Sequence, residues 1–80
     1  PDYPAISRRL GEEGKLMLQV ELDESGRISN TRIINSSGHS RLDNAALAAV
    51  KTWRCKPAVR DGQAVKAIAL QPFNFVIQGD

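Results

Sequence analysis

Cysteine, histidine and aromatic residues are scarce in this chain of 80 residues, which has one Cys, one His, one Trp, one Tyr and two Phe. The single cysteine, Cys55, excludes an intramolecular disulfide and a zinc site built on paired cysteines. We expect Cys55 to be a small buried core residue, since free cysteine is among the most buried residue types.

Charge of one sign is also missing, because 11 Lys and Arg nearly balance 9 Asp and Glu, for a formal net charge of +2. Basic residues scattered in this way, with few aromatic residues among them, indicate solvated faces rather than a nucleic-acid-binding surface. No apolar run approaches the roughly 20 residues that span a bilayer, and no signal peptide is visible. The chain begins at Pro1 without a Met, so we expect a fragment of a longer protein.

What the chain does contain is the composition of a small globular domain. Hydrophobic residues make up 41% and charged residues 25%, which is too apolar for a disordered segment. No repeat, linker or low-complexity tract interrupts the sequence. We therefore expect one domain over residues 1–80.

The clearest pattern predicts a strand from Lys15 to Asp23. Its apolar residues alternate with polar ones, broken only by Met17, so that one face is apolar; they are Leu16, Leu18, Val20 and Leu22. A turn at residues 24–26 leads to a second strand, Arg27–Asn35, and so predicts a hairpin. Ile28 and Ile33 lie five residues apart and share a face only if a bulge intervenes, so the register of this strand stays open.

A helix is predicted over Leu42–Trp53. Ser40-Arg41-Leu42-Asp43 matches a capping box in which Ser40 accepts a hydrogen bond from the Asp43 N–H. An apolar stripe follows at helical spacing, formed by Leu42, Ala46, Ala49, Val50 and Trp53. Pro57 is expected to stop this helix, and a shorter helical turn is expected at residues 5–10.

The last predicted strand runs from Val65 to Gln78. Pro72 lies in its middle, and because proline cannot donate to a ladder, we expect this strand at an edge of the sheet. The strongest apolar residues change phase across Pro72, which predicts a bulge there. Strand, strand, helix and strand in this order predict a two-layer α+β fold: a small antiparallel sheet of about three strands with one main helix packed across it.

Residues for catalysis are missing from the sequence. His39, the one imidazole, lies between Gly38 and Ser40 in a polar loop and is expected to be solvated. No two carboxylates have a spacing that suggests paired acid and base work, and no glycine-rich phosphate loop follows a strand. We expect no catalytic residue, no metal site and no cofactor.

Several short runs, in order and at their present spacing, resemble the TonB C-terminal domain family, energy transducers of Gram-negative bacteria. Each run alone is weak, but the set spans nearly the whole chain. The runs are Tyr3-Pro4-Ala5, Gly11-Glu12-Glu13-Gly14-Lys15, Ser25-Gly26-Arg27-Ile28, Ser36-Ser37-Gly38, Leu42-Asp43-Asn44-Ala45-Ala46-Leu47, Trp53-Arg54, Lys56-Pro57-Ala58 and Pro72-Phe73-Asn74-Phe75. The chain departs from the family at Arg8, where many relatives carry Gln, and at Cys55, where an aromatic residue usually follows Trp-Arg.

The resemblance implies a periplasmic docking module whose parent protein is anchored in the inner membrane and joins the proton-driven ExbB/ExbD motor. Its partners would be outer-membrane transporters for siderophores, haem or cobalamin, held by their TonB box as a strand added beside the last strand. Arg8 falls where relatives contact residues around the box. The remaining residues expected to meet the partner alternate along the last strand: Val65, Ala67, Ala69, Gln71, Phe73, Phe75 and Ile77. A structural role is expected for Tyr3, Pro4, Trp53, Arg54 and Pro57.

Two alternatives stay open at the level of sequence. A TolA-like periplasmic transducer domain has a similar shape and also binds partners by strand addition, although the Tyr-Pro and Leu-Asp-Asn-Ala-Ala-Leu runs favour the TonB family. A module that binds peptidoglycan, or forms a homodimer through its edge strands, belongs to a different class.

Overall fold

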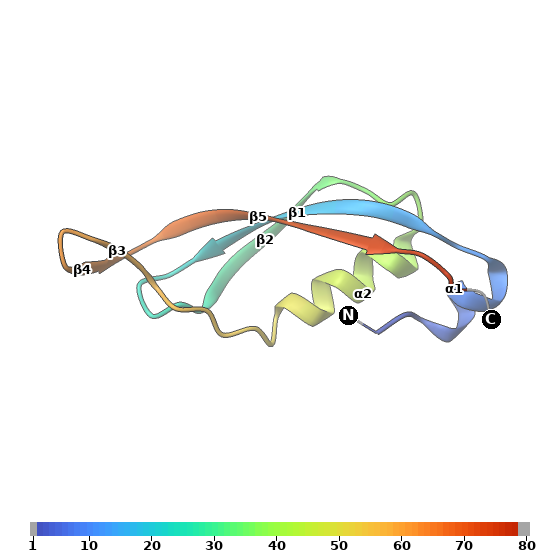
Figure 1. Cartoon of the computed structure of the whole chain (residues 1–80), viewed down its shortest axis with the longest axis horizontal. Helices are drawn as coiled ribbons and strands as arrows, with labels where there is room; N and C mark the ends of the chain where they lie inside the picture. The colour runs from blue at the N-terminus through green and yellow to red at the C-terminus, as the bar shows by residue number, and fades with distance from the viewer. Residues whose placement is uncertain (1, 79–80) are drawn as a thin grey trace.

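The central strand, β1 (Gly14–Leu22), pairs antiparallel with a neighbour on each side, β2 (Ile28–Asn35) and β5 (Ala67–Phe75), giving the order β2-β1-β5 (Figure 1). The computed structural model describes residues 2–78 of the chain. One helix, α2 (Ser40–Val50), lies against one face of this sheet, and a short helix, α1 (Ala5–Leu10), precedes β1. The predicted α+β architecture is thus confirmed.

The core forms where the apolar face of β1 meets the apolar stripe of α2. Leu18, Leu42 and Val50 are completely buried, because alternation on the strand and helical spacing on α2 direct them to the same layer. The remaining members of the core cluster are Leu16, Ala46, Phe73 and Phe75. The face of the sheet that is turned away from α2 is not covered by any helix or strand among residues 2–78.

The β1–β2 hairpin is held by the carboxylate of Asp23. This carboxylate accepts hydrogen bonds from the Ser25 N–H (2.9 Å), the Ser25 hydroxyl (2.6 Å) and the Arg27 N–H (3.0 Å). The hydrogen bond from the Ser25 hydroxyl and that from the Arg27 N–H hold the pKa of Asp23 below its usual value. Gly26 adopts φ +86° in this turn, and a Cβ there would lie 1.9 Å from the Cys55 carbonyl oxygen, so that glycine is required.

Bulges settle the register of β2. Leu22 pairs with Ile28 and Glu21 with Asn30, so Ser29 is an extra residue on β2. At the other end Leu18 pairs with Ile33 and Met17 with Asn35, which leaves Ile34 extra. Because of the first bulge, Ile28 and Ile33 do share a face, although they are five residues apart.

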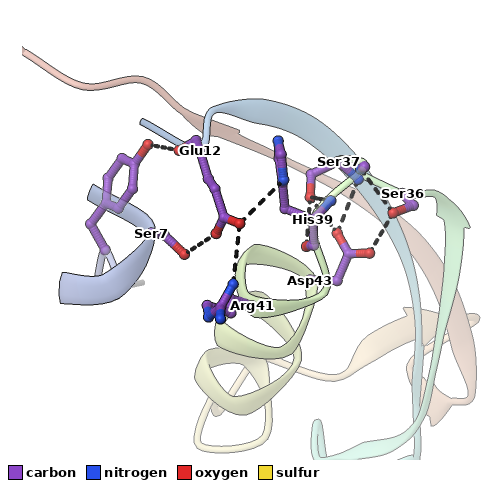
Figure 2. Close-up of polar contacts among 9 residues, drawn as sticks. Ser7, Glu12, Ser36, Ser37, His39, Arg41 and Asp43 are labelled. Atoms are coloured by element: carbon purple, nitrogen blue, oxygen red, sulfur yellow. Dashed lines mark hydrogen bonds and ion pairs between the residues drawn. The ribbon is translucent and has the colours of Figure 1, made fainter. Parts of the chain in front are cut away.

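Helix α2 begins in a different way from the predicted capping box. The Asp43 N–H donates to the His39 carbonyl oxygen (3.1 Å), and no side chain caps this end, so the predicted bond to Ser40 is wrong. Ser40 is already inside the helix. Instead the Asp43 carboxylate reaches back, where it accepts from the Ser37 N–H (3.0 Å) and from the hydroxyls of Ser37 (2.7 Å) and Ser36 (Figure 2).

The end of α2 is also earlier than predicted. The helix ends at Val50 and does not continue to Trp53 or Pro57. The Thr52 hydroxyl donates to the Ala49 carbonyl oxygen (2.9 Å), and the Trp53 N–H donates to that of Val50 (3.0 Å), which tightens the last turn. Trp53 is thereby released from the helical stripe and packs beside Phe73 instead.

The predicted strand Val65–Gln78 is a strand only from Ala67 to Phe75, which is β5. Val65 belongs instead to β4 (Gln63–Val65), which pairs with β3 (Ala58–Arg60) in a separate two-stranded ribbon. This ribbon lies at one end of the molecule and lengthens it (Figure 1). The radius of gyration is 14.7 Å, whereas about 11.6 Å is typical of a compact domain of this length.

Replacing a core residue tests this packing. We expect Leu18→Ala to lower the free energy of unfolding by about 2–5 kcal/mol, because it leaves a cavity between β1 and α2. Leu10→Ala on α1, where the side chain is 61% exposed, should change it by no more than about 0.5 kcal/mol. Urea unfolding followed by circular dichroism measures both, and equal losses for the two variants would contradict the assigned core.

The Asp43 hydrogen bonds predict a dependence of stability on pH. Burial raises the pKa of Asp43, but the hydrogen bonds from Ser36 and Ser37 outweigh it and hold the pKa below its usual value. A depressed pKa in the folded state stabilises the fold above the unfolded value of about 3.9, and this contribution is lost as the pH falls through the folded pKa.

We therefore expect Asp43→Asn to lower the free energy of unfolding by about 1–3 kcal/mol at pH 7, since a hydrogen-bonded buried carboxylate is lost. The variant should also lose less stability than the parent chain between pH 4.5 and pH 2.5. Asp61→Asn, exposed in the β3–β4 turn, is the matched charge control. The free energy of unfolding is measured by urea unfolding at each pH. If it falls equally with pH in the parent chain and in Asp43→Asn, the role of this carboxylate is refuted.

Candidate functional site

The outer edge of β5 is the candidate site. β5 pairs with β1 over nine consecutive residues, from Phe75 opposite Gly14 to Ala67 opposite Leu22, without any shift in register. Its other side has no partner strand among residues 2–78. The opposite edge of the sheet, on β2, is interrupted by the bulges at Ser29 and Ile34. Bulges blunt an edge against further pairing, so β5 presents the more regular of the two edges.

Pro72 lies on this edge strand, as predicted, but it makes no bulge. It pairs with Met17 in an unbroken ladder, so the predicted bulge is wrong. The large apolar residues change phase because those before Pro72 lie on one face of the sheet and those after it lie on the other. Phe73 is 8% exposed and points into the core, whereas Leu70 is 61% exposed on the face away from α2. A proline on an edge can leave its missing N–H on the unpaired side.

The residues predicted to meet a partner fall mostly on the face covered by α2. Phe73 and Phe75 are buried in the core, so their side chains are not available to a partner. Within β5, Ala67 and Gln71 are half-buried and Ala69 is exposed. Val65 ends β4, outside the three-stranded sheet.

Ile77, the last residue of that set, lies beyond the end of β5, and its N–H donates to Oε2 of Glu13 (2.6 Å). Two exposed side chains of β5, Ile68 and Leu70, were not predicted as site residues. Strict alternation through Pro72, with Phe73 and Phe75 pointing inward, is the signal that would have found them.

The N-terminal segment lies beside the end of β5. The Tyr3 ring meets Phe75 edge to face, with centroids 5.3 Å apart, and the Tyr3 hydroxyl donates to the Glu12 carbonyl oxygen. Burial, and then the charge of Glu13, raises the pKa of Tyr3. The Arg8 guanidinium lies 5.5 Å from the centroid of the same ring, a cation–π contact. A hollow of about 170 Å³ beside the end of the strand is lined by Tyr3, Arg8, Val76, Ile77 and Gln78.

A single carboxylate, that of Glu12, fixes this N-terminal segment to α2 (Figure 2). Oε1 accepts from the buried Ser7 hydroxyl on α1 (2.7 Å). Oε2 lies 3.2 Å from Nη1 of Arg41 and 3.5 Å from Nδ1 of His39. His39, predicted as solvated, is therefore half-buried at the start of α2. These contacts hold α1, and with it Arg8, at a fixed place beside β5.

The segment after α2 closes the other end of the core. Trp53 is half-buried, with its ring centroid 5.9 Å from that of Phe73. Arg54 is exposed and forms a backbone bridge with Arg27. Pro57 lies against Gly26 at the hairpin turn. Cys55 is half-buried and lies outside the core cluster, so the prediction of a buried core cysteine is wrong. Its backbone rather than its side chain makes the close contact there, because the Cys55 N–H donates to the Gly26 carbonyl oxygen (3.0 Å).

The chemistry available at the edge is that of the backbone. In the part of the chain that the structure describes, no three His, Cys, Asp or Glu residues gather in a way that could hold a metal ion. No helix within residues 2–78 has the length and apolar character to cross a membrane. What β5 offers is a row of peptide groups able to pair with an extended segment.

Comparison with known proteins places this fold in a family. The family model for the Gram-negative bacterial TonB protein C-terminal matches residues 1–77. Protein TonB of Vibrio cholerae is 37% identical over 79 residues, which cover 99% of this chain and 32% of that protein. Protein tonB2 of Pseudomonas aeruginosa is 40% identical over 75 residues, covering 94% of this chain and 28% of that protein.

A solved structure agrees with the sequence matches. The solution NMR structure of the Pseudomonas aeruginosa TonB CTD superposes with a TM-score of 0.84 at 28% identity, covering 100% of this chain and 81% of that one. The chain spans about a third of the length of these curated relatives. From its sequence and its fold alike, the chain belongs to the TonB C-terminal domain family.

Proposed function

We propose that this chain is the docking module of a TonB-type energy transducer, and that it binds the TonB box of outer-membrane transporters as an added strand on β5. The observation that supports this most is the unpaired, unbulged edge of β5 in the order β2-β1-β5. An extended peptide is the natural partner of such an edge. Membership of the TonB family supplies the class of partner.

The energetics suit a partner that is bound and released in each cycle. Roughly six backbone hydrogen bonds along β5 would contribute about 0.5–1.5 kcal/mol each. Ordering a flexible peptide offsets part of that gain, which leaves a modest affinity. Pairing through the backbone also tolerates different side chains in the partner, as a module that serves several transporters requires.

Arg8 is proposed to contact the partner where the added strand passes the end of β5. It is exposed beside the hollow at Val76 and Gln78, and its position is fixed by the Tyr3 ring and the contacts of Glu12. Phe73 and Phe75 contribute to this site by holding the strand in place from the core.

The rest of the machine is proposed to lie outside this segment. The parent protein would be anchored in the inner membrane, act with the ExbB/ExbD motor and reach across the periplasm to transporters for siderophores, haem or cobalamin. This module would transmit force and catalyse no reaction. The family match favours TonB over the TolA-like alternative. Self-pairing through the β5 edge, or peptidoglycan binding, remains the competing function.

A peptide titration tests the proposal. Ten-residue peptides from the periplasmic N-termini of outer-membrane transporters, added to the ¹⁵N-labelled chain, should shift the backbone resonances of Ala67–Phe75 and of residues 3–9 in a saturable way. Scrambled peptides should not. Backbone pairing alternates along a strand, so N-methyl groups at every second peptide residue should abolish binding in one phase and spare it in the other.

The outcomes are distinct. Equal binding by both N-methylated phases, or shifts confined to β2, would reject strand addition at β5. Sedimentation of the free chain accompanies the titration, because self-pairing would compete for the same edge. If concentration alone shifts the β5 resonances and no peptide does, the edge serves dimerisation instead.

A further inference from the structure

The face of β5 away from α2 carries a row of uncovered apolar side chains. Ile68 is 64% and Leu70 61% exposed, and Pro72 follows two residues later. These three lie on one face because Phe73 and Phe75, in the opposite phase, point into the core. On β1 their cross-strand neighbours are Glu21, Gln19 and Met17 respectively.

On this face of the sheet, the apolar row runs along the β5 edge and has no counterpart in the β2 residues paired with β1. The β2 residues that pair with Gln19, Glu21 and Met17 are Arg32, Asn30 and Asn35, all polar. The apolar row therefore follows the free edge and not the blunted one. At each end of the row a hollow reaches across the sheet to β2, one of about 530 Å³ lined by Pro72, Met17 and Asn35 among others, and one of about 660 Å³ lined by Ile68, Glu21 and Ser29 among others. Edge strands are often guarded by charged side chains or by proline. β5 carries Pro72 but no charged residue, and two large aliphatic side chains are exposed on it instead.

We propose that Ile68 and Leu70 select the partner, which is an extended segment with aliphatic residues at every second position. Those residues project onto the face away from α2, against Ile68 and Leu70, while the alternate positions carry small or polar residues. The inference rests on the proposed strand addition at β5, and it adds to the backbone pairing a preference for particular side chains in the partner.

The occupant is fixed by the edge itself. A strand added to β5 places each side chain about 4.5–5.5 Å, Cβ to Cβ, from the residue opposite it on the same face. On the face away from α2, the residues opposite are Ile68 and Leu70. On the other face β5 offers Ala67, Ala69 and Gln71 before the phenylalanines enter the core. Only one phase of the partner thus meets large apolar side chains.

The magnitude is modest and measurable. An aliphatic cross-strand pair changes Kd by about 1.4- to 5-fold relative to a pair of alanines, so two pairs give about 2- to 25-fold. This is small beside the combined backbone bonds, so side chains rank partners that the backbone would otherwise accept equally.

The test uses variants that keep the strand. We expect Ile68→Thr with Leu70→Thr to weaken binding of transporter N-terminal peptides about 2- to 25-fold by fluorescence anisotropy, since threonine preserves β-propensity and removes the aliphatic surface. The matched control is Val59→Thr with Ile34→Thr. These side chains are 66% and 40% exposed but lie away from the β5 edge, on β3 and β2, so their change should leave Kd unaltered.

The peptide provides the complementary half of the test. Replacing the aliphatic residues of one phase by serine should weaken binding by the same factor, and the loss should disappear against the Ile68→Thr, Leu70→Thr chain. Peptides that shift the β5 resonances but bind this variant and the control variant equally would overturn the side-chain selection and leave the docking function intact. If no peptide perturbs β5, both proposals fall together.

Discussion

Everything else in this molecule depends on α2 packing against one face of a three-stranded sheet. Leu42, Ala46 and Val50 form a stripe that packs in one cluster with Leu16 and Leu18 of β1 and with Phe73 and Phe75 of β5. Within residues 2–78 this one helix covers one face of the sheet, so a single layer is buried. As a direct result, no helix or strand of that part of the chain covers the opposite face or the outer edge of β5. The single covering helix thus accounts both for the small size of the fold and for the open β5 edge to which a further strand could be added.

Two carboxylates fix segments outside the core to α2. Glu12 ties α1 to the start of α2 through Ser7 and Arg41, and Asp43 ties the loop before α2 to the helix through Ser36 and Ser37 (Figure 2). Hydrogen bonds to charged acceptors are stronger than neutral ones. Those of Glu12 hold the N-terminal segment beside β5, so a partner at that edge would meet a surface that is already formed.

Much of the fold follows from local patterns in the sequence. Alternation in β1 and helical spacing in α2 predict the core because each element has one buried face. The ribbon β3–β4 was missed because strands of three residues carry too little periodicity to detect. The end of α2 was misplaced because the Thr52 hydroxyl competes for a helical carbonyl. Edge position was inferred from Pro72, but the phase change beside it was taken for a bulge. The apolar residues before Pro72 face away from α2, and those after it face the core. The sequence alone does not show which face α2 covers.

The most direct test of the free edge is amide hydrogen exchange along β5, with and without a saturating transporter peptide. In the free chain, every second residue between Ala67 and Phe75, apart from Pro72, which has no N–H, should have an amide that exchanges fast, since alternate N–H groups point away from β1. The peptide should protect those amides and leave the ones already paired with β1 nearly unchanged. Fast amides that stay unprotected in the complex, or new protection on β2 instead, would contradict docking at β5.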